Sequence, residues 1–305
     1  MNILWTNSTL SGIGDRMIDL CLLSTYAKIK NATLYLGWRE LDKNHKQSWD
    51  KSETVTMEWK GVRYVDYLYD NIKQYFTFPN NVVINNDPPS IDEYFESYLG
   101  GVYSPIKFYN EFMSNIVSRD VFINEFFKTT LQIKPTKKLK SIVGDTQPDL
   151  TLHIRREDKV RDKDRIGGQS QYGFEFIQYN ELEFLKNKTF EVFEKLYSED
   201  VVTYISSDED EEKNSYSEKF NVITSENFKI DFEFEKTYID LYLMSISKTI
   251  ILSQRHSNFS ILASLINRSR LIYLYNQNCN IHEFKFNELD NFFYYEYIMD
   301  KNNII

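Results

Sequence analysis

From Asp149 onward, short apolar runs alternate with longer helical patterns, and this alternation constrains the fold more than any other feature of the sequence. Runs rich in β-branched and apolar residues predict strands at residues 150–154, 201–206, 221–224, 249–253 and 271–275. Between the first two runs, apolar residues from Leu182 to Leu196 recur at the spacing of a helix. Strands that alternate with helices predict βαβ units and a parallel sheet.

The first half of the chain opens in the same way. It predicts a strand at residues 2–5, a polar loop ending in Ser-Gly-Ile-Gly-Asp at residues 11–15, an apolar helix at 15–29 and a strand at 33–36. Residues 38–60 are polar and read as a loop, and the patterns that follow predict helices at 91–98 and 107–131. The sequence therefore predicts an α/β protein with two Rossmann-like domains and a cleft between them.

A boundary between the two domains is expected at residues 132–148. This segment carries two prolines, a glycine and a cluster of lysines, which is the composition of a linker. We therefore expect a first domain at residues 1–140 and a second at 141–281. The aromatic tail, residues 282–305, is expected to be helical in part and to pack back towards the first domain.

Charge and composition exclude several classes of function. The chain has 36 Lys and Arg against 45 Asp and Glu, a net charge of −9, which argues against a nucleic-acid partner. It has no basic and apolar leader and no run of about 18 apolar residues, so we expect no transmembrane segment and a cytoplasmic protein. Cys21 and Cys279 are too few for a disulfide framework or a cysteine-rich zinc site.

The most informative charges follow the strand predicted at 150–154. His153, Arg155, Arg156, Asp158 and Lys159 stand at its carboxyl end, where open α/β sheets bind ligands. A guanidinium fixed there can bind a diphosphate with two hydrogen bonds and oppose charge that develops on a departing phosphate. The alternative is a solvated charged loop.

A second candidate for anion binding is the Ser-rich turn at residues 257–260. Ser257 is a good N-cap, and the unpaired N–H groups of a helix that starts near Asn258 form a site for a phosphate. The alternative is that Ser257 and Ser260 only cap that helix and pack it. The turn follows the apolar strand at 249–253 in the same predicted domain as Arg155, which favours the phosphate site.

A third cluster begins where the strand at 201–206 ends. The carboxylate of Asp208 can accept hydrogen bonds from a ligand bound at this end of the strand. Asp208 and Asp210 also match the metal-binding DxD of GT-A glycosyltransferases, where Mg²⁺ or Mn²⁺ bridges the diphosphate. For Asp210, Glu211 and Glu212 we prefer a simpler interpretation, an acidic first turn that is favourable for the helix dipole.

The charged motif after the first strand of the second half is similar to a known family. His153, Arg155, Arg156, Asp158 and Lys159 match the HxRRxDK pattern of the α-1,6-fucosyltransferases, and the HxRR part is shared with the α-1,2-fucosyltransferases. The resemblance implies a GT-B glycosyltransferase in which residues 141–281 bind GDP-fucose and residues 1–140 form the acceptor side. It further implies that Arg155 holds the diphosphate.

The same resemblance implies further donor-binding residues in other segments. They are Gly12 and Gly14 in a loop over the donor, Ser207 and Asp208 at the nucleoside, Asp240 on a helix, Ser253 at a strand end, and Ser257, Asn258, Phe259 and Ser260 in the turn. The position at which the α-1,6 enzymes have a glutamate proposed as general base is Lys163 here. The base is therefore expected among Asp162, Asp164 and Glu175, and we place Asp162 and Asp164 with Arg155 as the catalytic residues.

These observations predict an inverting, metal-independent glycosyltransferase without a cofactor. It would move fucose, or a related sugar, from GDP-fucose to a hydroxyl of a glycan acceptor, in the cytoplasm or at the periphery of a membrane where glycans are assembled. One alternative is a metal-dependent GT-A enzyme that uses Asp208 and Asp210. The other is a non-catalytic protein that binds a nucleotide sugar or a glycan.

Overall fold

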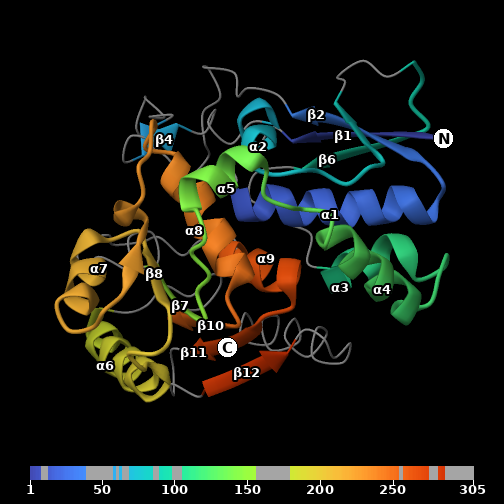
Figure 1. Ribbon diagram of the computed structural model, residues 1–305. Coiled ribbons are helices and arrows are strands. Elements are labelled where there is room, and N and C mark those ends of the chain that lie inside the picture. Colours follow the sequence, from blue (N-terminus) through green and yellow to red (C-terminus); the bar gives the residue numbers. More distant parts are fainter. Residues whose placement is uncertain are drawn as a thin grey trace. The chain divides into compact units, whose positions relative to one another are not determined.

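In a computed structural model, the chain forms two compact units, each of which contains a β-sheet (Figure 1). It describes residues 1–7, 13–38, 58–59, 62–63, 69–84, 89–97, 105–155, 179–253, 257–274 and 281–285. Unit 1 comprises residues 1–144 together with 230–238, and unit 2 comprises residues 145–229 and 239–305. The first unit therefore includes a short segment from the middle of the second half, which the sequence did not indicate.

Unit 1 is an α/β layer with four strands in the order β5-β2-β1-β6. These are β1 (Asn2–Asn7), β2 (Thr33–Trp38), β5 (Val82–Ile84) and β6 (Glu93–Ser97), and all their pairings are parallel. A separate antiparallel pair is formed by β3 (Glu58–Trp59) and β4 (Val62–Arg63). The helical elements are α1 (Ile13–Ile29), α2 (Tyr69–Tyr75), α3 (Pro105–Phe108), the π-helix η2 (Tyr109–Met113), α4 (Arg119–Thr130) and α5 (Lys137–Val143).

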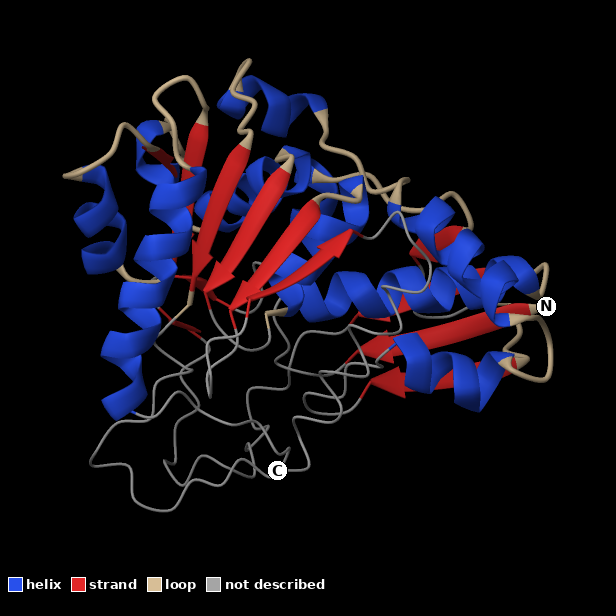
Figure 2. Cartoon of the chain, turned by 90° about the horizontal axis from the view of Figure 1, so that it is seen from below, coloured by secondary structure: helices blue, strands red, loops and turns tan. Residues whose placement is uncertain are grey.

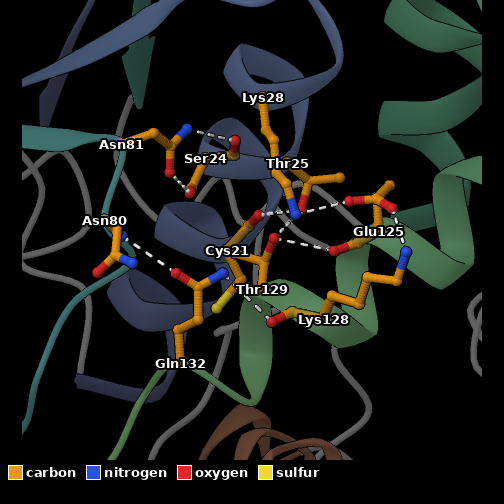
Figure 3. Close-up of polar contacts among 10 residues, drawn as sticks. All are labelled: Cys21, Ser24, Thr25, Lys28, Asn80, Asn81, Glu125, Lys128, Thr129 and Gln132. Carbon is orange, nitrogen blue, oxygen red and sulfur yellow. Dashed lines mark hydrogen bonds and ion pairs between the residues drawn. The ribbon is translucent and has the colours of Figure 1, made fainter.

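Helix α1 is the centre of unit 1, because its residues are buried on almost every side. Polar contacts fix it against α4 (Figure 3). Thr25 donates its hydroxyl hydrogen bond to the carbonyl of Cys21 at 2.7 Å, and its Oγ1 lies 3.1 Å from Oγ1 of Thr129 on α4. Glu125 of α4 forms an ion pair of 2.7 Å with Lys28, so the two helices are joined both inside and at their rim.

Unit 2 contains a six-stranded sheet in the order β12-β11-β10-β7-β8-β9. These are β7 (Leu150–Ile154), β8 (Thr203–Ser207), β9 (Ile223–Thr224), β10 (Thr249–Ser253), β11 (Arg270–Leu274) and β12 (Ile281–Lys285). All neighbours are parallel except β11 and β12. The helices are α6 (Tyr179–Leu196), α7 (Asp210–Ser217), the 3-10 turn η3 (Ser225–Asn227), α8 (Glu235–Ile246) and α9 (Asn258–Asn267).

The core of unit 2 lies between its sheet and α6. Figure 2 shows the strands side by side with helices against them, and buried residues of β7, such as Leu152 and Ile154, pack with Leu185 and Phe193 of α6. This packing explains why β7 is buried at all five positions, as expected for an inner parallel strand with helices on its faces.

Most elements of the second half agree with the sequence prediction, since β7 and β10 have the predicted bounds and β8, β9 and β11 differ by a few residues. The predicted helix at 91–98 is wrong, because these residues contribute β6. There Tyr94 is exposed and Phe95 is buried, the alternation of a strand that pairs with β1.

Three other segments also differ from prediction. The helix expected at 107–131 is interrupted before α4, where Ser118 caps a new helix by accepting a hydrogen bond from the N–H of Val121. The expected linker at 132–148 contains α5, whose Leu139 and Val143 are one turn apart and buried, although the boundary between the two units, at residues 144 and 145, lies within the segment. The tail is expected to begin at residue 282, but residues 282–285 belong to strand β12. Residues 286–305 lie outside the described part of the chain.

Candidate functional site

The carboxyl ends of three neighbouring strands bring predicted site residues to one edge of the sheet in unit 2. Ile154 of β7 is in register with Ser253 of β10 and with Ser207 of β8. Arg155 follows β7 directly and is half-buried at that edge. Because the strands are parallel, this edge is the one at which α/β sheets bind their ligands.

His153 joins this edge to helix α9. Its side chain is 5% exposed, and Nδ1 forms a hydrogen bond with Oγ of Ser260 in the first turn of α9. The ring of Phe259 lies 5.7 Å from the His153 ring, centroid to centroid. The strand that carries Arg155 is therefore held to the beginning of α9 by a buried polar contact.

Ser257 precedes α9 and has an unusual environment for an N-cap residue. Its backbone is extended, with φ −135° and ψ 103°, and its side chain makes no capping hydrogen bond. The residue is 1% exposed, and no group in the described part of the chain hydrogen-bonds to its Oγ. A buried hydroxyl without a partner costs about 1–3 kcal/mol, so a ligand that accepts or donates there would recover stability.

The end of β8 is supported by a second polar group, the half-buried Asp240 of α8. Asp240 accepts a hydrogen bond from the hydroxyl of Tyr204, and a further one from Ser206. Burial raises the pKa of Asp240 to about 6, although both hydrogen bonds oppose this shift. The Asp240 carboxylate therefore supports the strand that leads to Ser207 and Asp208.

Two more of the predicted donor-binding serines, like Ser260, already form a hydrogen bond within the protein. Oγ of Ser253 is fully buried and lies 2.5 Å from Oγ1 of Thr189 on α6. Oγ of Ser207 accepts a hydrogen bond of 3.1 Å from the N–H of Glu209. Asp208 is half-buried beside it.

The acidic residues after Asp208 form the first turn of α7. Asp210 is exposed and pairs with Lys213 at 2.8 Å, and Lys213 also binds Glu226 at 3.0 Å. Glu212 is buried and pairs with Lys186 at 3.1 Å. Across the described ranges, no three His, Cys, Asp or Glu side chains are grouped so that they could hold a metal ion.

The remaining predicted residues are divided between described and undescribed segments. Gly14 is buried in the first turn of α1, beside Asp15. Gly12 and the residues that follow Arg155 in the motif and in the proposed base segment lie outside the described residues: Arg156, Asp158, Lys159, Asp162, Asp164 and Glu175.

Sequence reasoning missed Tyr204 and Thr189, the partners of Asp240 and Ser253. Each pair is separated by tens of residues along the chain, and both partners occupy ordinary core positions of their elements. No local pattern distinguishes such residues from other core positions, so only the folded arrangement identifies them.

The fold defines the class of architecture first: an α/β fold of the GT-B type, with a parallel sheet in unit 1 and a sheet in unit 2 that is parallel except between β11 and β12. No protein-family model matches the sequence, and no curated protein matches it. The chain is similar in structure to the fucosyltransferase NodZ from Bradyrhizobium in its selenomethionine form, at 12% identity and a TM-score of 0.50 over 93% of this chain and 98% of NodZ. At this identity the likeness shows the fold alone, and the predicted fold class is confirmed.

Two further solved structures are similar to the chain. NodZ alpha-1,6-fucosyltransferase soaked with GDP-fucose is 13% identical, with a TM-score of 0.49 over 93% of this chain and 98% of that one. POFUT1 in complex with GDP is 12% identical, with a TM-score of 0.44 over 90% of this chain and 98% of that one. None of the described helices has the length and apolar composition needed to cross a membrane.

Proposed function

We propose that the chain is a glycosyltransferase that transfers fucose, or a closely related sugar, from GDP-fucose to a hydroxyl of a glycan acceptor. The reaction inverts the configuration at the anomeric carbon of the sugar and needs neither a metal nor a cofactor. The enzyme acts in the cytoplasm or at the periphery of a membrane, and nucleic acid is not a partner. The fold shared with the fucosyltransferase NodZ and the HxRRxDK motif support this assignment.

The observation that carries the proposal is that the strand leading to Arg155 is tied to the beginning of α9. The bond between His153 and Ser260 ties the Arg155 strand to that turn, and Ser257 presents a buried hydroxyl there for which the described chain offers no partner. A diphosphate could bind both groups. One phosphate can bind the guanidinium of Arg155, and the other can accept hydrogen bonds from the N–H groups of α9 and from the hydroxyl of Ser257.

The neighbouring strand end supplies the nucleoside side of the donor site. Ser207 ends β8 and Asp208 follows it; β8 lies next to β7 in the sheet, and Asp240 accepts a hydrogen bond from Tyr204 of β8. A carboxylate at Asp208 can accept hydrogen bonds from guanine N1 and N2 or from the ribose hydroxyls. The resemblance adds Gly12, Gly14, Arg156, Asp158, Lys159, Asn258 and Phe259 to the donor site.

In the proposed reaction, the acceptor hydroxyl attacks the anomeric carbon from the face opposite the diphosphate. The bond between that carbon and the phosphate oxygen breaks, and its electron pair leaves with GDP. Arg155 and the N–H groups of α9 stabilise the charge that grows on the phosphate. The hydroxyl proton passes to a carboxylate, for which Asp162, Asp164 and Glu175 are the candidates.

Binding of the donor can be tested by thermal shift with GDP, GDP-fucose, UDP-glucose and CDP as separate ligands. We expect stabilisation by GDP and GDP-fucose, because ligands that bind only the folded state raise its apparent stability. Ser257→Ala should reduce that shift by removing the buried hydroxyl. Stabilisation by UDP-glucose or CDP without a response to GDP would contradict the proposed donor.

A further inference from the structure

The loop that leads into α8 carries an aromatic ring that is both exposed and held in place. Phe232 is 56% exposed, and its ring stacks on Phe234 with 5.4 Å between centroids and 11° between planes. Phe234 in turn meets Tyr75 and Tyr238 edge-on, at 6.2 Å and 6.0 Å. Phe232 is therefore largely exposed, and its ring packs on Phe234, which is itself held by two further rings.

The backbone of the loop is fixed by a buried carboxylate. Oε2 of Glu235, which is 1% exposed, accepts hydrogen bonds from the N–H groups of Asp231 at 2.7 Å and Phe232 at 3.2 Å. Its Oε1 accepts a hydrogen bond of 2.6 Å from the hydroxyl of Tyr75 and pairs with Lys138 at 3.1 Å. Burial alone would raise the pKa of Glu235, but these hydrogen bonds outweigh it and lower the pKa, so the carboxylate stays charged at neutral pH.

Carboxylates flank the exposed ring on both sides in the sequence. Asp231 is exposed, and Glu233 is about half exposed and pairs with Lys236 at 2.7 Å. The face of an aromatic ring is electron-rich and attracts the weakly positive C–H face of a sugar, while carboxylates accept hydrogen bonds from sugar hydroxyls. The negative charge disfavours anionic sugars.

We propose that Phe232, with Asp231 and Glu233, is a subsite for a neutral oligosaccharide, at which the glycan acceptor is held. This rests on the proposed function, since it names the acceptor as a neutral glycan. The loop belongs to unit 1, which also contains residues 1–140, the part of the chain expected to form the acceptor side. An acceptor subsite there requires no conformational ordering of the ring, because Glu235 and Phe234 already hold it.

The test is saturation-transfer NMR of the full chain, without nucleotide, with cellotetraose, maltotetraose and tetra-N-acetylchitotetraose, and with tetragalacturonate as the anionic comparison. We expect at least one neutral oligosaccharide to bind and the anionic one to bind more weakly. Phe232→Ala should weaken that binding about tenfold, and Phe232→Trp should preserve it. Phe184→Ala is the matched control, because Phe184 of α6 is 55% exposed, and this variant should bind as the unmodified chain does.

Three results would overturn the subsite. They are no binding of any neutral oligosaccharide, equal binding by the Phe232→Ala and Phe184→Ala variants, or a change of oligomeric state in Phe232→Ala by sedimentation, which would make the ring a protein contact. Thermal shift by GDP should be the same in Phe232→Ala and the unmodified chain. If GDP fails to stabilise either protein while oligosaccharides bind, the donor proposal fails and the subsite remains.

Discussion

Arg155 is the side chain on which the proposed chemistry depends most directly. We expect Arg155→Ala to reduce transfer about 10²- to 10³-fold, because it removes a charge that opposes negative charge growing in the transition state. Arg155→Lys should restore little, since an ammonium cannot reproduce the planar fork of the guanidinium. The measurement is release of GDP from GDP-fucose in the presence of acceptor, with a thermal melt to verify folding. Turnover by the alanine variant near that of the unmodified chain would remove Arg155 from the mechanism.

His153 is expected to act by positioning, through its bond to Ser260. An asparagine side chain places a polar atom near the position of Nδ1, whereas a glutamine places one near Nε2. His153→Asn should therefore retain most of the transfer rate, and His153→Gln should lose up to about 10²-fold, because the Arg155 strand is no longer tied to α9.

Ser260→Ala provides the complementary control for His153. If the two residues act as one unit, the double variant His153→Gln with Ser260→Ala should be no slower than the slower single variant. The reverse order, in which His153→Gln is active and His153→Asn is inactive, would show that Nε2 contacts the donor directly.

The residues of the candidate site could be found from the sequence only where a local pattern carries them. Arg155 and Ser257 are of this kind, because each follows an apolar strand and precedes or begins a polar turn. The contact between His153 and Ser260 spans 107 residues, and no local pattern encodes it. The sequence identified both residues as donor ligands, and the structure adds that they bind each other.

Among the elements, α8 combines two roles that its sequence does not separate. Its first residues, to Tyr238, belong to unit 1, where Tyr238 stacks on Tyr75 at 4.4 Å. Its later residues belong to unit 2, where Asp240 supports the end of β8. This explains why the helix is apolar along most of its length, because its first part has buried residues in unit 1 and its later part has buried residues in unit 2.

The contact between α8 and β8 predicts a pH dependence of stability. Because folding raises the pKa of Asp240 from 3.8 to about 6, the folded state binds its proton more tightly than the unfolded state does. Burial of the charged carboxylate therefore lowers the free energy of unfolding above pH 6. This loss of stability disappears as the pH falls through 6 towards 4 and the carboxylate is protonated. A shift of this size corresponds to a few kcal/mol, on the order of 2–3.

Asp240→Asn isolates this contribution, because asparagine is neutral at every pH and its Oδ1 can still accept from Tyr204. We expect the free energy of unfolding of the unmodified chain, relative to this variant, to increase between pH 7.5 and pH 5. Urea titrations at each pH measure it, and the difference cancels opposite contributions from carboxylates with a lowered pKa, such as Glu125 and Glu235. Parallel curves for the two proteins would mean that Asp240 does not titrate in this range.

Local pattern predicted the elements of unit 2 better than those of unit 1, and the reason is physical. The strands β7 and β10 are buried along almost their whole length, so their sequences are rich in apolar and β-branched residues and have clear ends. Residues 91–98 place apolar side chains at Ile91, Tyr94 and Phe95, a spacing that fits a helix equally well. Pairing of β6 with β1 decides between the two structures, and this long-range contact is not encoded locally.

At the scale of the whole molecule, net charge and fold class together determine how an anionic donor can be bound. The chain carries a net charge of −9, so a diphosphate must be met by local groups rather than by a general field. In a GT-A enzyme a metal ion supplies that local charge through a DxD pair, whereas in this fold Arg155 and the beginning of α9 can supply it. The ion pair of Asp210 with Lys213 favours the second arrangement, because this carboxylate is already bound to a cation of the protein.

We therefore expect the transfer rate to be unchanged by saturating EDTA, and Asp210→Ala to be nearly silent, since an exposed ion pair contributes at most about 1 kcal/mol. Asp208→Ala does not separate the two interpretations, because Asp208 contacts the nucleoside in one and the metal ion in the other, so the substitution should impair use of GDP-fucose in either case. The Asp210→Ala variant and the response to chelation are the measurements that separate the two interpretations. An EDTA-sensitive rate that Mn²⁺ restores, together with an inactive Asp210→Ala variant, would establish metal-dependent transfer and assign the diphosphate to the DxD pair instead of Arg155.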